Sequence, residues 1–177
     1  MKNIVYFDLE TKKSAQEVGG WGNIHKLGLS IGVTYSTADE AYHIYTESQV
    51  DDLVREILRA DLVVGFNHVG FDYRVLQEYT LMDLTLAPHL DLMVDIQKVI
   101  QKRISLDSIA TATFGAEKTA EGLQAVQWYK EGKMYEIAEY CCYDVKITKL
   151  VHEFGMENKA VFFKDRFGKL NKVAVDW

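Results

Sequence analysis

Four carboxylates and one tyrosine lie in three separated segments, and together their types and spacing could do chemistry. Asp8 and Glu10 lie in YFDLET, Asp72 lies in GFNHVGFD, and Tyr140 precedes Asp144 by four residues in EYCCYDV. Carboxylate oxygens are the ligands that hard divalent cations such as Mg²⁺ prefer. A fold that brings these acids together would hold a pair of metal ions, and such pairs cleave phosphodiester bonds.

Each of these residues taken alone has a simpler structural explanation. On a helix, Tyr140 and Asp144 share one face, which is typical of an amphipathic surface helix with a tyrosine at its edge. Asp72 early in a helix would favour the positive end of the helix dipole. Asp-x-Glu on a strand is also a weak signal, so a globular domain whose acids never meet is one interpretation of the sequence.

The N-terminal half predicts the elements that carry the first three acids. On a strand over residues 3–10, Asp8 and Glu10 point to the same face, as two ligands of a metal pair require. Two antiparallel strands follow, then a helix that begins with a capping box formed by Ser48 and Asp51, then a short buried parallel strand and a helix that carries Asp72. Their expected ranges are 27–36, 40–46, 50–58, 62–66 and 69–79.

The C-terminal half predicts two helices and a hairpin. The helices cover 105–114, with Gly115 as C-cap, and 134–154, with Gly155 as the stop. The whole order predicts an α/β fold: a mixed central sheet, antiparallel over strands 1–3 and then parallel, flanked by helices. We expect one domain over residues 1–155, with a C-terminal β-hairpin over 156–177 packed on the same domain.

Composition excludes several classes of protein. The 177 residues are enough to bury a core, and 48% of them are hydrophobic, so the chain is globular rather than disordered. No segment has the ~20 continuous apolar residues of a membrane span, and the charged start MKNIVYFDLETKK predicts no signal peptide. The adjacent Cys141 and Cys142 make a poor disulfide or zinc site, which fits a cytoplasmic protein with no membrane partner.

The net charge of −6 argues mildly against a nucleic-acid partner, because such proteins usually carry a basic surface. Bound divalent cations would weaken that objection by reversing the local sign. Lys118 is a candidate phosphate contact, although a solvated lysine is the default. Two basic groups are more commonly solvated faces than binding patches: Lys98, Lys102 and Arg103, and Lys159, Lys164, Arg166, Lys169 and Lys172.

The order of the acidic motifs resembles the DEDD exonucleases, the DnaQ-like branch of the ribonuclease H-like superfamily. Their first motif is similar to FDLET, and their second to Asn67 followed five residues later by Asp72. Their third, Tyr-x-x-x-Asp, is similar to Tyr140 and Asp144. One subgroup has a histidine one position before that tyrosine, where this chain has Glu139, so the resemblance favours the DEDDy subgroup. It implies a ribonuclease H-like three-layer fold and 3′–5′ exonuclease activity.

Three further segments resemble predicted exonuclease domains, some of them YprB-like, that are related to the proofreading domain of family B DNA polymerases. They are VGGWGNIHKLGLSIGV, SLDSIATATFG and DRFGKLNKVAVDW. This narrower resemblance makes the 3′ end of single-stranded DNA a modest favourite over RNA as the substrate. It also implies that a helicase or polymerase, if one is needed, is supplied by another chain.

The resemblance implies a role for each acid with two divalent ions, Mg²⁺ or Mn²⁺. Asp8 would bridge the ions, Glu10 and Asp144 would help hold the one that activates water, and Asp72 would hold or position the other. Tyr140 would orient the attacking water, since a phenol with a pKa of about 10 is a weak base at neutral pH. Without metal the acids would repel one another, which should raise a carboxylate pKa and make metal binding stabilising.

The candidates for substrate binding are Thr11, Trp21, Asn67, His68 and Phe71. Trp21 lies in a long connection over residues 11–27, where it either anchors a glycine loop from a buried position or stacks on a terminal base. Asn67 has an alternative role as the cap of the helix that carries Asp72. For His68, a satisfied polar contact is the commoner role.

Two other functions stay open from the sequence. An RNA exonuclease of the ribonuclease D kind would use the same motifs, and the 2′-OH contact that separates RNA from DNA leaves no signal in the sequence. The other is a catalytically inactive module that binds nucleic acid or recruits a protein. The complete Asp-Glu-Asp-Asp-Tyr set speaks against that second alternative.

Overall fold

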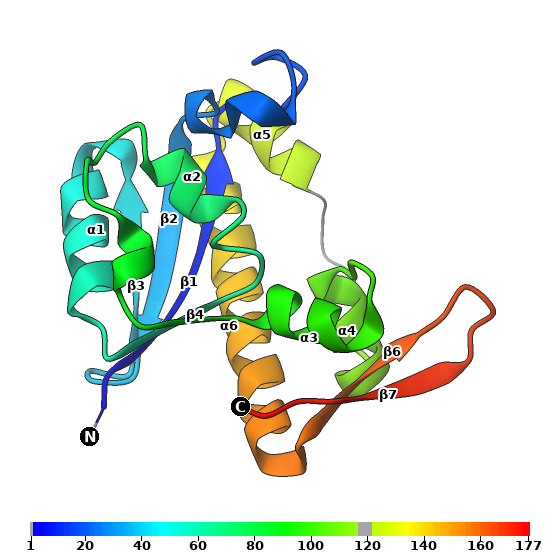
Figure 1. Cartoon of the computed structure of the whole chain (residues 1–177). Coiled ribbons are helices and arrows are strands. Elements are labelled where there is room, and N and C mark those ends of the chain that lie inside the picture. Colours follow the sequence, from blue (N-terminus) through cyan, green and yellow to red (C-terminus); the bar gives the residue numbers. More distant parts are fainter. Residues whose placement is uncertain (1, 117–121) are drawn as a thin grey trace.

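A five-stranded mixed sheet forms the centre of the computed structural model, which describes residues 2–116 and 122–177 (Figure 1). Lys118 therefore lies outside the described residues. The strand order is β3-β2-β1-β4-β5, in which β1, β2 and β3 are antiparallel neighbours and β4 and β5 run parallel to β1. The strands are β1 (Ile4–Thr11), β2 (Leu29–Ser36), β3 (Ala41–Thr46), β4 (Leu62–Gly65) and β5 (His89–Asp91). The predicted fold class is confirmed.

Helices and short 3-10 turns connect and cover these strands. The α-helices are α1 (Val50–Arg59), α2 (Asp72–Leu76), α3 (Leu92–Ile100), α4 (Leu106–Phe114), α5 (Gly122–Lys130) and α6 (Met134–Asn158). The 3-10 helices are η1 (Trp21–Lys26), η2 (Glu47–Gln49) and η3 (Leu84–Leu86). Within the described ranges, no helix combines the length and the apolar character that a membrane crossing requires.

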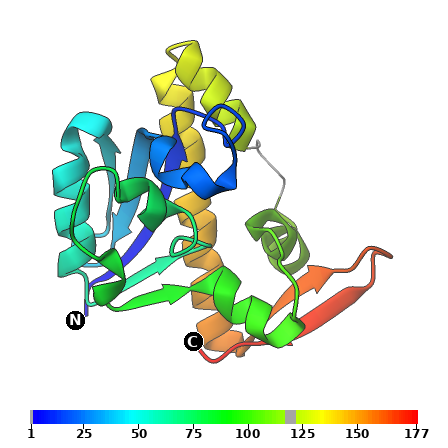
Figure 2. The same ribbon diagram turned by 45° about the horizontal axis from the view of Figure 1, so that its top comes forward.

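The alternation of β1 places apolar side chains on both faces of the sheet. Val5, Phe7 and Leu9 pack into a core shared with α1 and α2, whereas Tyr6 packs into a second core with α6. The sheet is thus the middle of three layers, and α6 runs along the face opposite α1 (Figures 1 and 2). Because Asp8 and Glu10 share the face of Tyr6, the strand directs both carboxylates towards α6.

The two edges of β1 do not extend equally far. β1 pairs with β2 as far as Thr11, with a register shift between Glu10 and Thr11, but it pairs with β4 only over residues 4–6. β4 ends at Gly65, so the last part of β1 has an open edge on that side. The segment that follows β4 can therefore approach the backbone next to Asp8 and Glu10.

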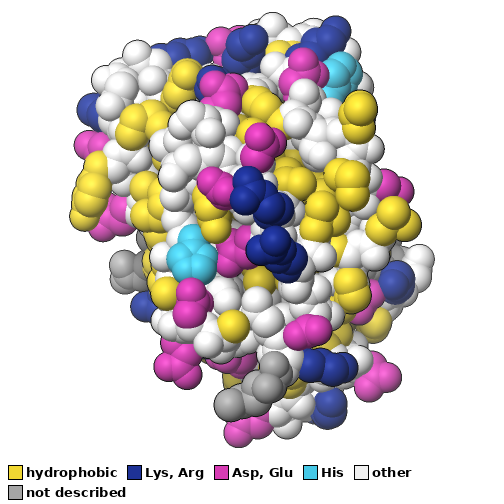
Figure 3. Space-filling view, turned by 90° about the vertical axis from the view of Figure 1, so that its left-hand side faces the viewer, with side chains coloured by type: hydrophobic (Ala, Val, Ile, Leu, Met, Phe, Trp, Pro, Cys, Tyr) yellow, Lys and Arg dark blue, Asp and Glu magenta, His cyan; other side chains and the backbone are white. Residues whose placement is uncertain are grey.

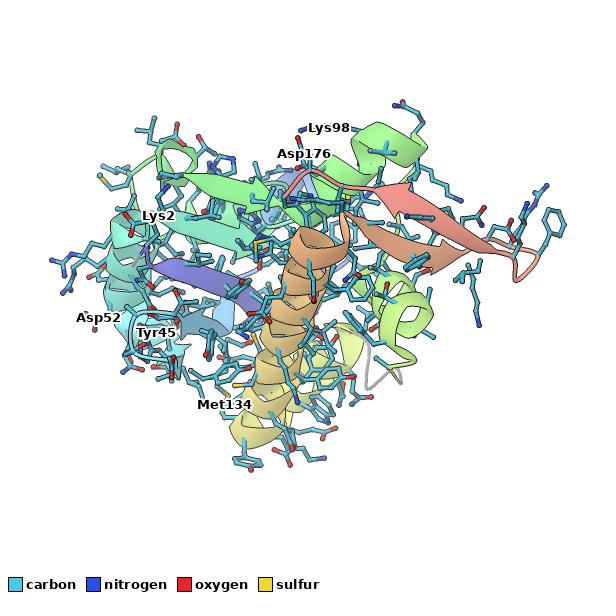
Figure 4. The ribbon with its side chains drawn as sticks, turned by 90° about the horizontal axis from the view of Figure 1, so that it is seen from below. Lys2, Tyr45, Asp52, Lys98, Met134 and Asp176 are labelled. Carbon is cyan, nitrogen blue, oxygen red and sulfur yellow. The ribbon has the colours of Figure 1, made fainter. Side chains whose placement is uncertain are left out.

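The predicted C-terminal hairpin is present as β6 (Ala160–Lys164) and β7 (Leu170–Ala174). It packs against α4 and projects beyond the rest of the fold (Figures 1 and 4). Figure 4 shows Lys98 of α3 close to Asp176, beyond the end of β7, while Met134 marks the distant start of α6.

The helix predicted over 69–79 is wrong in length, because only α2 is helical there. Asn67 has a left-handed φ of 66°, and the backbone N–H groups of Asn67 and Val69 donate to the Asp91 carboxylate at 2.8 and 3.1 Å. These bonds hold the segment after β4 as a loop. A one-turn helix can then begin only at Asp72.

Gly155 does not stop the long helix as predicted, since α6 continues to Asn158 and Lys159 takes the left-handed cap position. A Cβ on Gly155 would lie 2.4 Å from the Trp177 ring. The glycine is therefore required by close packing of Trp177 against the helix. Gly115, by contrast, does cap α4 with a φ of 70°, as predicted.

The expected capping box also differs, because Thr46 and Gln49 form it at the start of η2 in place of Ser48 and Asp51. The sequence interpretation missed α3, α5 and β5, a strand of only three residues.

Candidate active site

Three of the predicted carboxylates converge at the end of β1. One ligand oxygen from each of Asp8, Glu10 and Asp144 can be chosen so that all three lie within 4.8 Å of one another. Asp8 and Glu10 come from adjacent same-face positions of β1, and Asp144 comes from the middle of α6, which packs on that face. The interpretation in which the acids never meet is therefore wrong.

Asp72 approaches the same place from the open edge of β1. Its Oδ1 accepts a hydrogen bond from the backbone N–H of Leu9 at 3.1 Å, and its side chain is only 3% exposed. It is not part of the trio of mutually close oxygens, but its negative charge raises the pKa of both Asp8 and Glu10. The three separated sequence segments thus meet in one site.

The helix α6 supplies Tyr140, Cys141 and Asp144 to this site. Tyr140 and Asp144 lie one turn apart on this helix, and the Tyr140 hydroxyl is close enough to the Asp144 carboxylate to interact with it. The Tyr140 ring packs edge-on against Trp128 of α5, with 6.3 Å between the ring centroids. Cys141 is buried, with its sulfur 3.5 Å from an oxygen of the Asp8 carboxylate, so packing of α6 also fixes Asp8.

Burial and mutual repulsion make this group of acids unfavourable in its charged form. Burial is the largest cause that raises the pKa of Asp8 and of Glu10 well above the usual range, and the neighbouring carboxylates add to it. Burial also raises the pKa of Asp72 and of Asp144 to about 7. The predicted rise is confirmed, although burial contributes more than the expected repulsion.

The donor set fits divalent metal ions. Every ligand atom offered by Asp8, Glu10 and Asp144 is a hard carboxylate oxygen, and these oxygens are as close as a shared cation requires. In the described part of the chain, no lysine, arginine or histidine nitrogen lies within 4.0 Å of these carboxylates or of Asp72. A bound cation would therefore supply the missing positive charge.

A cavity of about 630 Å³ opens beside the acids. Its lining includes the acids Asp8, Glu10 and Asp72 and the aromatic residues Trp21 and Phe71. The other predicted residues Thr11 and Asn67 also line it, as do Lys13, Phe66 and Leu123, which were not among the predicted site residues.

Trp21 is 68% exposed, so its interpretation as a buried anchor is wrong. Its ring centroid lies 6.4 Å from that of Phe71, in an edge-on arrangement. The 3-10 helix η1 that carries Trp21 contacts α2, and this contact brings the long connection to the mouth of the cavity.

Asn67 and its neighbour His68 lie in different environments. Asn67 lines the cavity but does not cap α2, because Phe71 occupies the N-cap position and no side chain caps it. His68 is fully buried, away from the cavity, with its ring edge-on to Tyr73 at 4.8 Å. Burial lowers the pKa of His68 to about 4. The predicted substrate contact of His68 is therefore contradicted.

Asp91 is a residue of this region that the sequence interpretation missed. Its carboxylate accepts from the N–H groups of Asn67 and Val69 and, at 3.3 Å, from Val94 at the start of α3. One buried side chain thus caps α3 and holds the loop that leads to Asp72. An aspartate directly before the apolar run at residues 92–94 was the available signal, because aspartate favours the N-cap position.

Known proteins were compared with this arrangement of elements and acids. The family B DNA polymerase from the hyperthermophilic archaeon Pyrobaculum calidifontis has a similar structure, with a TM-score of 0.64 and 17% sequence identity. The similarity covers 87% of this chain but only 24% of the polymerase chain, so this chain corresponds to about a quarter of that protein. A search of curated proteins found no match.

The sequence profile of the RNase_H superfamily matches residues 5–154. This range begins in β1 and ends in α6, and it contains all four acids and Tyr140. A match over so much of the chain, together with the mixed sheet and the acid cluster at the end of β1, establishes the family: the chain belongs to the RNase_H superfamily.

Proposed function

We propose that this protein is a metal-dependent 3′–5′ exonuclease of the DEDDy type that shortens single-stranded nucleic acid, with DNA preferred over RNA. The observation that carries the proposal is the convergence of Asp8, Glu10 and Asp144 within 4.8 Å, next to a cavity with aromatic walls. The superfamily match and the likeness to a DNA polymerase chain agree with nuclease chemistry.

In this proposal Asp8, Glu10 and Asp144 would hold one divalent ion, and Asp72 would help to hold or position a second. When bound, Mg²⁺ or Mn²⁺ would activate water, neutralise charge on the phosphate and stabilise the leaving oxygen. The protein itself contributes fixed carboxylates, since burial and the Leu9 and Cys141 contacts restrict their movement.

Tyr140 acts as a positioning hydrogen-bond donor. Burial and the neighbouring acids raise the pKa of its hydroxyl above its ordinary value, so the phenol keeps its proton at neutral pH. A protonated phenol cannot accept a proton from water, but it can orient a water molecule. The interaction of the hydroxyl with Asp144 places it beside the acid cluster.

The cavity accepts the terminal nucleotide. Its volume of about 630 Å³ is within the usual range for small-molecule sites. Trp21 and Phe71 offer ring faces and edges to a base, and such stacking tolerates any base. Thr11 and Asn67 also line the cavity and supply polar groups. A helicase or polymerase on another chain would supply the single-stranded end.

The test uses purified protein, Mg²⁺ or Mn²⁺, and 5′-labelled single-stranded DNA, duplex DNA and RNA in parallel. We expect a ladder of 3′-shortened products from single-stranded DNA with either metal, and none with a chelator. Asp8→Ala should abolish the ladder without unfolding the protein, while the matched variant Asp51→Ala, on the exposed face of α1, should keep it.

The outcomes of this assay distinguish the proposed function from its alternatives. Faster shortening of RNA would favour the ribonuclease D-like alternative. Intact substrates in all three lanes with both metals would favour the inactive binding module. Shortening that persists in Asp8→Ala would refute the assignment of the acids.

A further inference from the structure

A chain of two further hollows leads away from the acid-lined cavity. The first, of about 460 Å³, shares Phe66 and Asn67 with that cavity and extends to Arg103 and Ser105 in the α3–α4 connection. The second, of about 300 Å³, shares Ser105 and extends to Lys164 at the end of β6. We call the path from Phe66 to Lys164 the α4 groove.

The α4 groove carries available positive charge. Arg103 and Lys164 are both exposed, and in the described part of the chain neither has a carboxylate within 4.0 Å. Their neighbours are engaged elsewhere, because Lys98 pairs with Asp95 at 2.7 Å and Lys102 lies over the Phe163 ring at 4.5 Å. The Lys102 contact also fixes the connection that carries Arg103 against the hairpin.

The groove joins the active site and continues onto the hairpin. Among the described residues that line it, Asp107 is the only acidic one, and it is near enough to Asp144 that its charge acts on that carboxylate. Beyond Lys164, the turn of the hairpin presents two further exposed basic residues, Arg166 and Lys169, and Lys172 is exposed on β7 opposite Phe162. A path that starts at acids able to hold metal and becomes basic fits a polyanion whose end lies in the cavity.

The face around α1 has a different character. Figure 3 shows basic, acidic and hydrophobic side chains interspersed over that side of the molecule. Arg55 on α1, for example, pairs with Asp52 at 3.0 Å. A basic residue on that face therefore supplies a control for the groove.

We propose that the α4 groove binds the sugar–phosphate backbone of the single strand next to its terminal nucleotide, guiding it past Arg103 and Lys164 to the hairpin. This inference rests on the proposed function. Arg103 would contact a phosphate near the cavity, and the guanidinium fork suits two phosphate oxygens. Lys164 would contact a phosphate further along the strand, and Phe66 offers a ring where the cavity and groove meet.

Binding as a function of strand length tests this inference. The full chain is titrated with fluorescent single-stranded DNA bearing hydrolysis-resistant phosphorothioate linkages, either a trinucleotide or a strand of about ten nucleotides. In this proposal the trinucleotide occupies the cavity and the near end of the groove but not Lys164, so the longer strand should bind more tightly. Variants Arg103→Gln and Lys164→Gln are compared with Arg59→Gln, a change of the same kind on exposed α1.

For the longer strand we expect each groove variant to weaken binding about 3- to 10-fold, and to lower the slope of log affinity against log salt by about 0.7. Lys164→Gln should leave trinucleotide binding unchanged, and Arg59→Gln should change neither strand.

Two kinds of result overturn the proposal in different ways. If the protein shortens DNA but Arg103→Gln and Lys164→Gln bind the longer strand as wild type does, the groove assignment is wrong and the proposed function stands. If wild type neither binds nor shortens any oligonucleotide, both fail together. If Arg59→Gln loses as much affinity as the groove variants, the strand is held by non-specific electrostatic attraction and not by the α4 groove.

Discussion

The Asp72 carboxylate accepts a hydrogen bond from the backbone N–H of Leu9, the residue between Asp8 and Glu10, at 3.1 Å. That N–H is available because β1 pairs with β4 only as far as Tyr6. The divergence of two parallel strands therefore creates the position that Asp72 fills. This hydrogen bond fixes the position of Asp72 relative to Asp8 and Glu10. It does so through the backbone of β1, independently of any side-chain partner.

This contact separates the structural role of Asp72 from its charge. Asp72→Asn keeps an amide oxygen that can accept from Leu9, but it removes the negative charge. We expect unfolding temperature to stay the same or rise, because a buried repulsive charge is lost. Nuclease kcat should fall at least about a hundredfold, since metal-based charge stabilisation is worth several kcal/mol.

Asp72→Ala is the comparison variant, because it loses both the charge and the acceptor for Leu9. It should be less stable than Asp72→Asn by about 1 kcal/mol, the usual net value of one hydrogen bond. Near-normal kcat in Asp72→Asn would show that the charge of Asp72 is not needed.

Metal binding should stabilise the fold. The charged acids are destabilised by burial and by one another, and a bound cation relieves both effects. At a Mg²⁺ or Mn²⁺ concentration about 100 times the dissociation constant, the free energy of unfolding should rise by about 2.7 kcal/mol. Thermal unfolding with increasing metal measures this rise.

Asp144→Asn should remove most of that stabilisation, while Asp51→Asn on α1 should retain it. An equal shift in both variants would place the metal effect at some other part of the protein.

Asp91 should act as a positioning residue for the loop that carries Asn67. Asp91→Ala leaves the N–H groups of Asn67 and Val69 without their acceptor and removes the cap of α3. We expect a loss of about 2–4 kcal/mol in the free energy of unfolding, from one lost cap and unpaired donors. Denaturant unfolding gives this value.

Because Asp91 holds the loop that leads to Asp72, its loss should lower activity as well as stability. At a temperature where Asp91→Ala is fully folded, kcat should still be lowered, because Asp72 follows the displaced loop. Asp91→Asn keeps one acceptor oxygen and should recover part of both losses. A folded Asp91→Ala protein with wild-type kcat would limit Asp91 to a structural role.

Much of the site could be predicted because its geometry is local. Strand alternation alone places Asp8 and Glu10 on one face, and helix periodicity alone places Tyr140 and Asp144 on one face. Both relationships need no knowledge of distant contacts. The positions of the first four strands along the chain were also predicted from local patterns, because each of these strands is four residues or longer.

The rest depends on contacts between residues far apart in the sequence. The loop before Asp72 was predicted as helix because its hydrogen bonds go to Asp91, 24 residues beyond Asn67. Trp21 reaches the cavity through packing of η1 on α2, which no local pattern reports. Gly155 looked like a helix stop because the Trp177 ring that requires a glycine there arrives from the end of the hairpin.

The packing of Trp177 on Gly155 makes a size-dependent prediction. Gly155→Ala adds a methyl group whose carbon would lie 2.4 Å from the Trp177 ring, so the ring must move. We expect a loss of about 1–3 kcal/mol in the free energy of unfolding, the usual cost of overpacking. Gly22→Ala is the matched control, because nothing lies within 4 Å of its added carbon. Equal stability of both variants would mean that the Trp177 ring yields without cost.

His152 should contribute to the loss of stability in acid. Its Nδ1 is 2.9 Å from the Tyr6 hydroxyl, its ring packs on Trp177, and burial lowers the pKa of His152 to about 4. In the unfolded chain the pKa is about 6.5. The unfolded state thus binds more protons below pH 6.5, so stability is complete above that pH and falls as the pH decreases towards 4.

The acids of the site act with the opposite sign, because their raised pKa values favour the folded state at lower pH and oppose it as the pH rises. Wild-type stability against pH therefore mixes both effects. Subtracting the curve of His152→Gln cancels the acids and also His68, which both proteins share. The difference should shrink from pH 7 to pH 4 by up to about 3 kcal/mol. A difference that is constant over this range would mean that His152 is protonated as easily in the folded protein as in the unfolded chain.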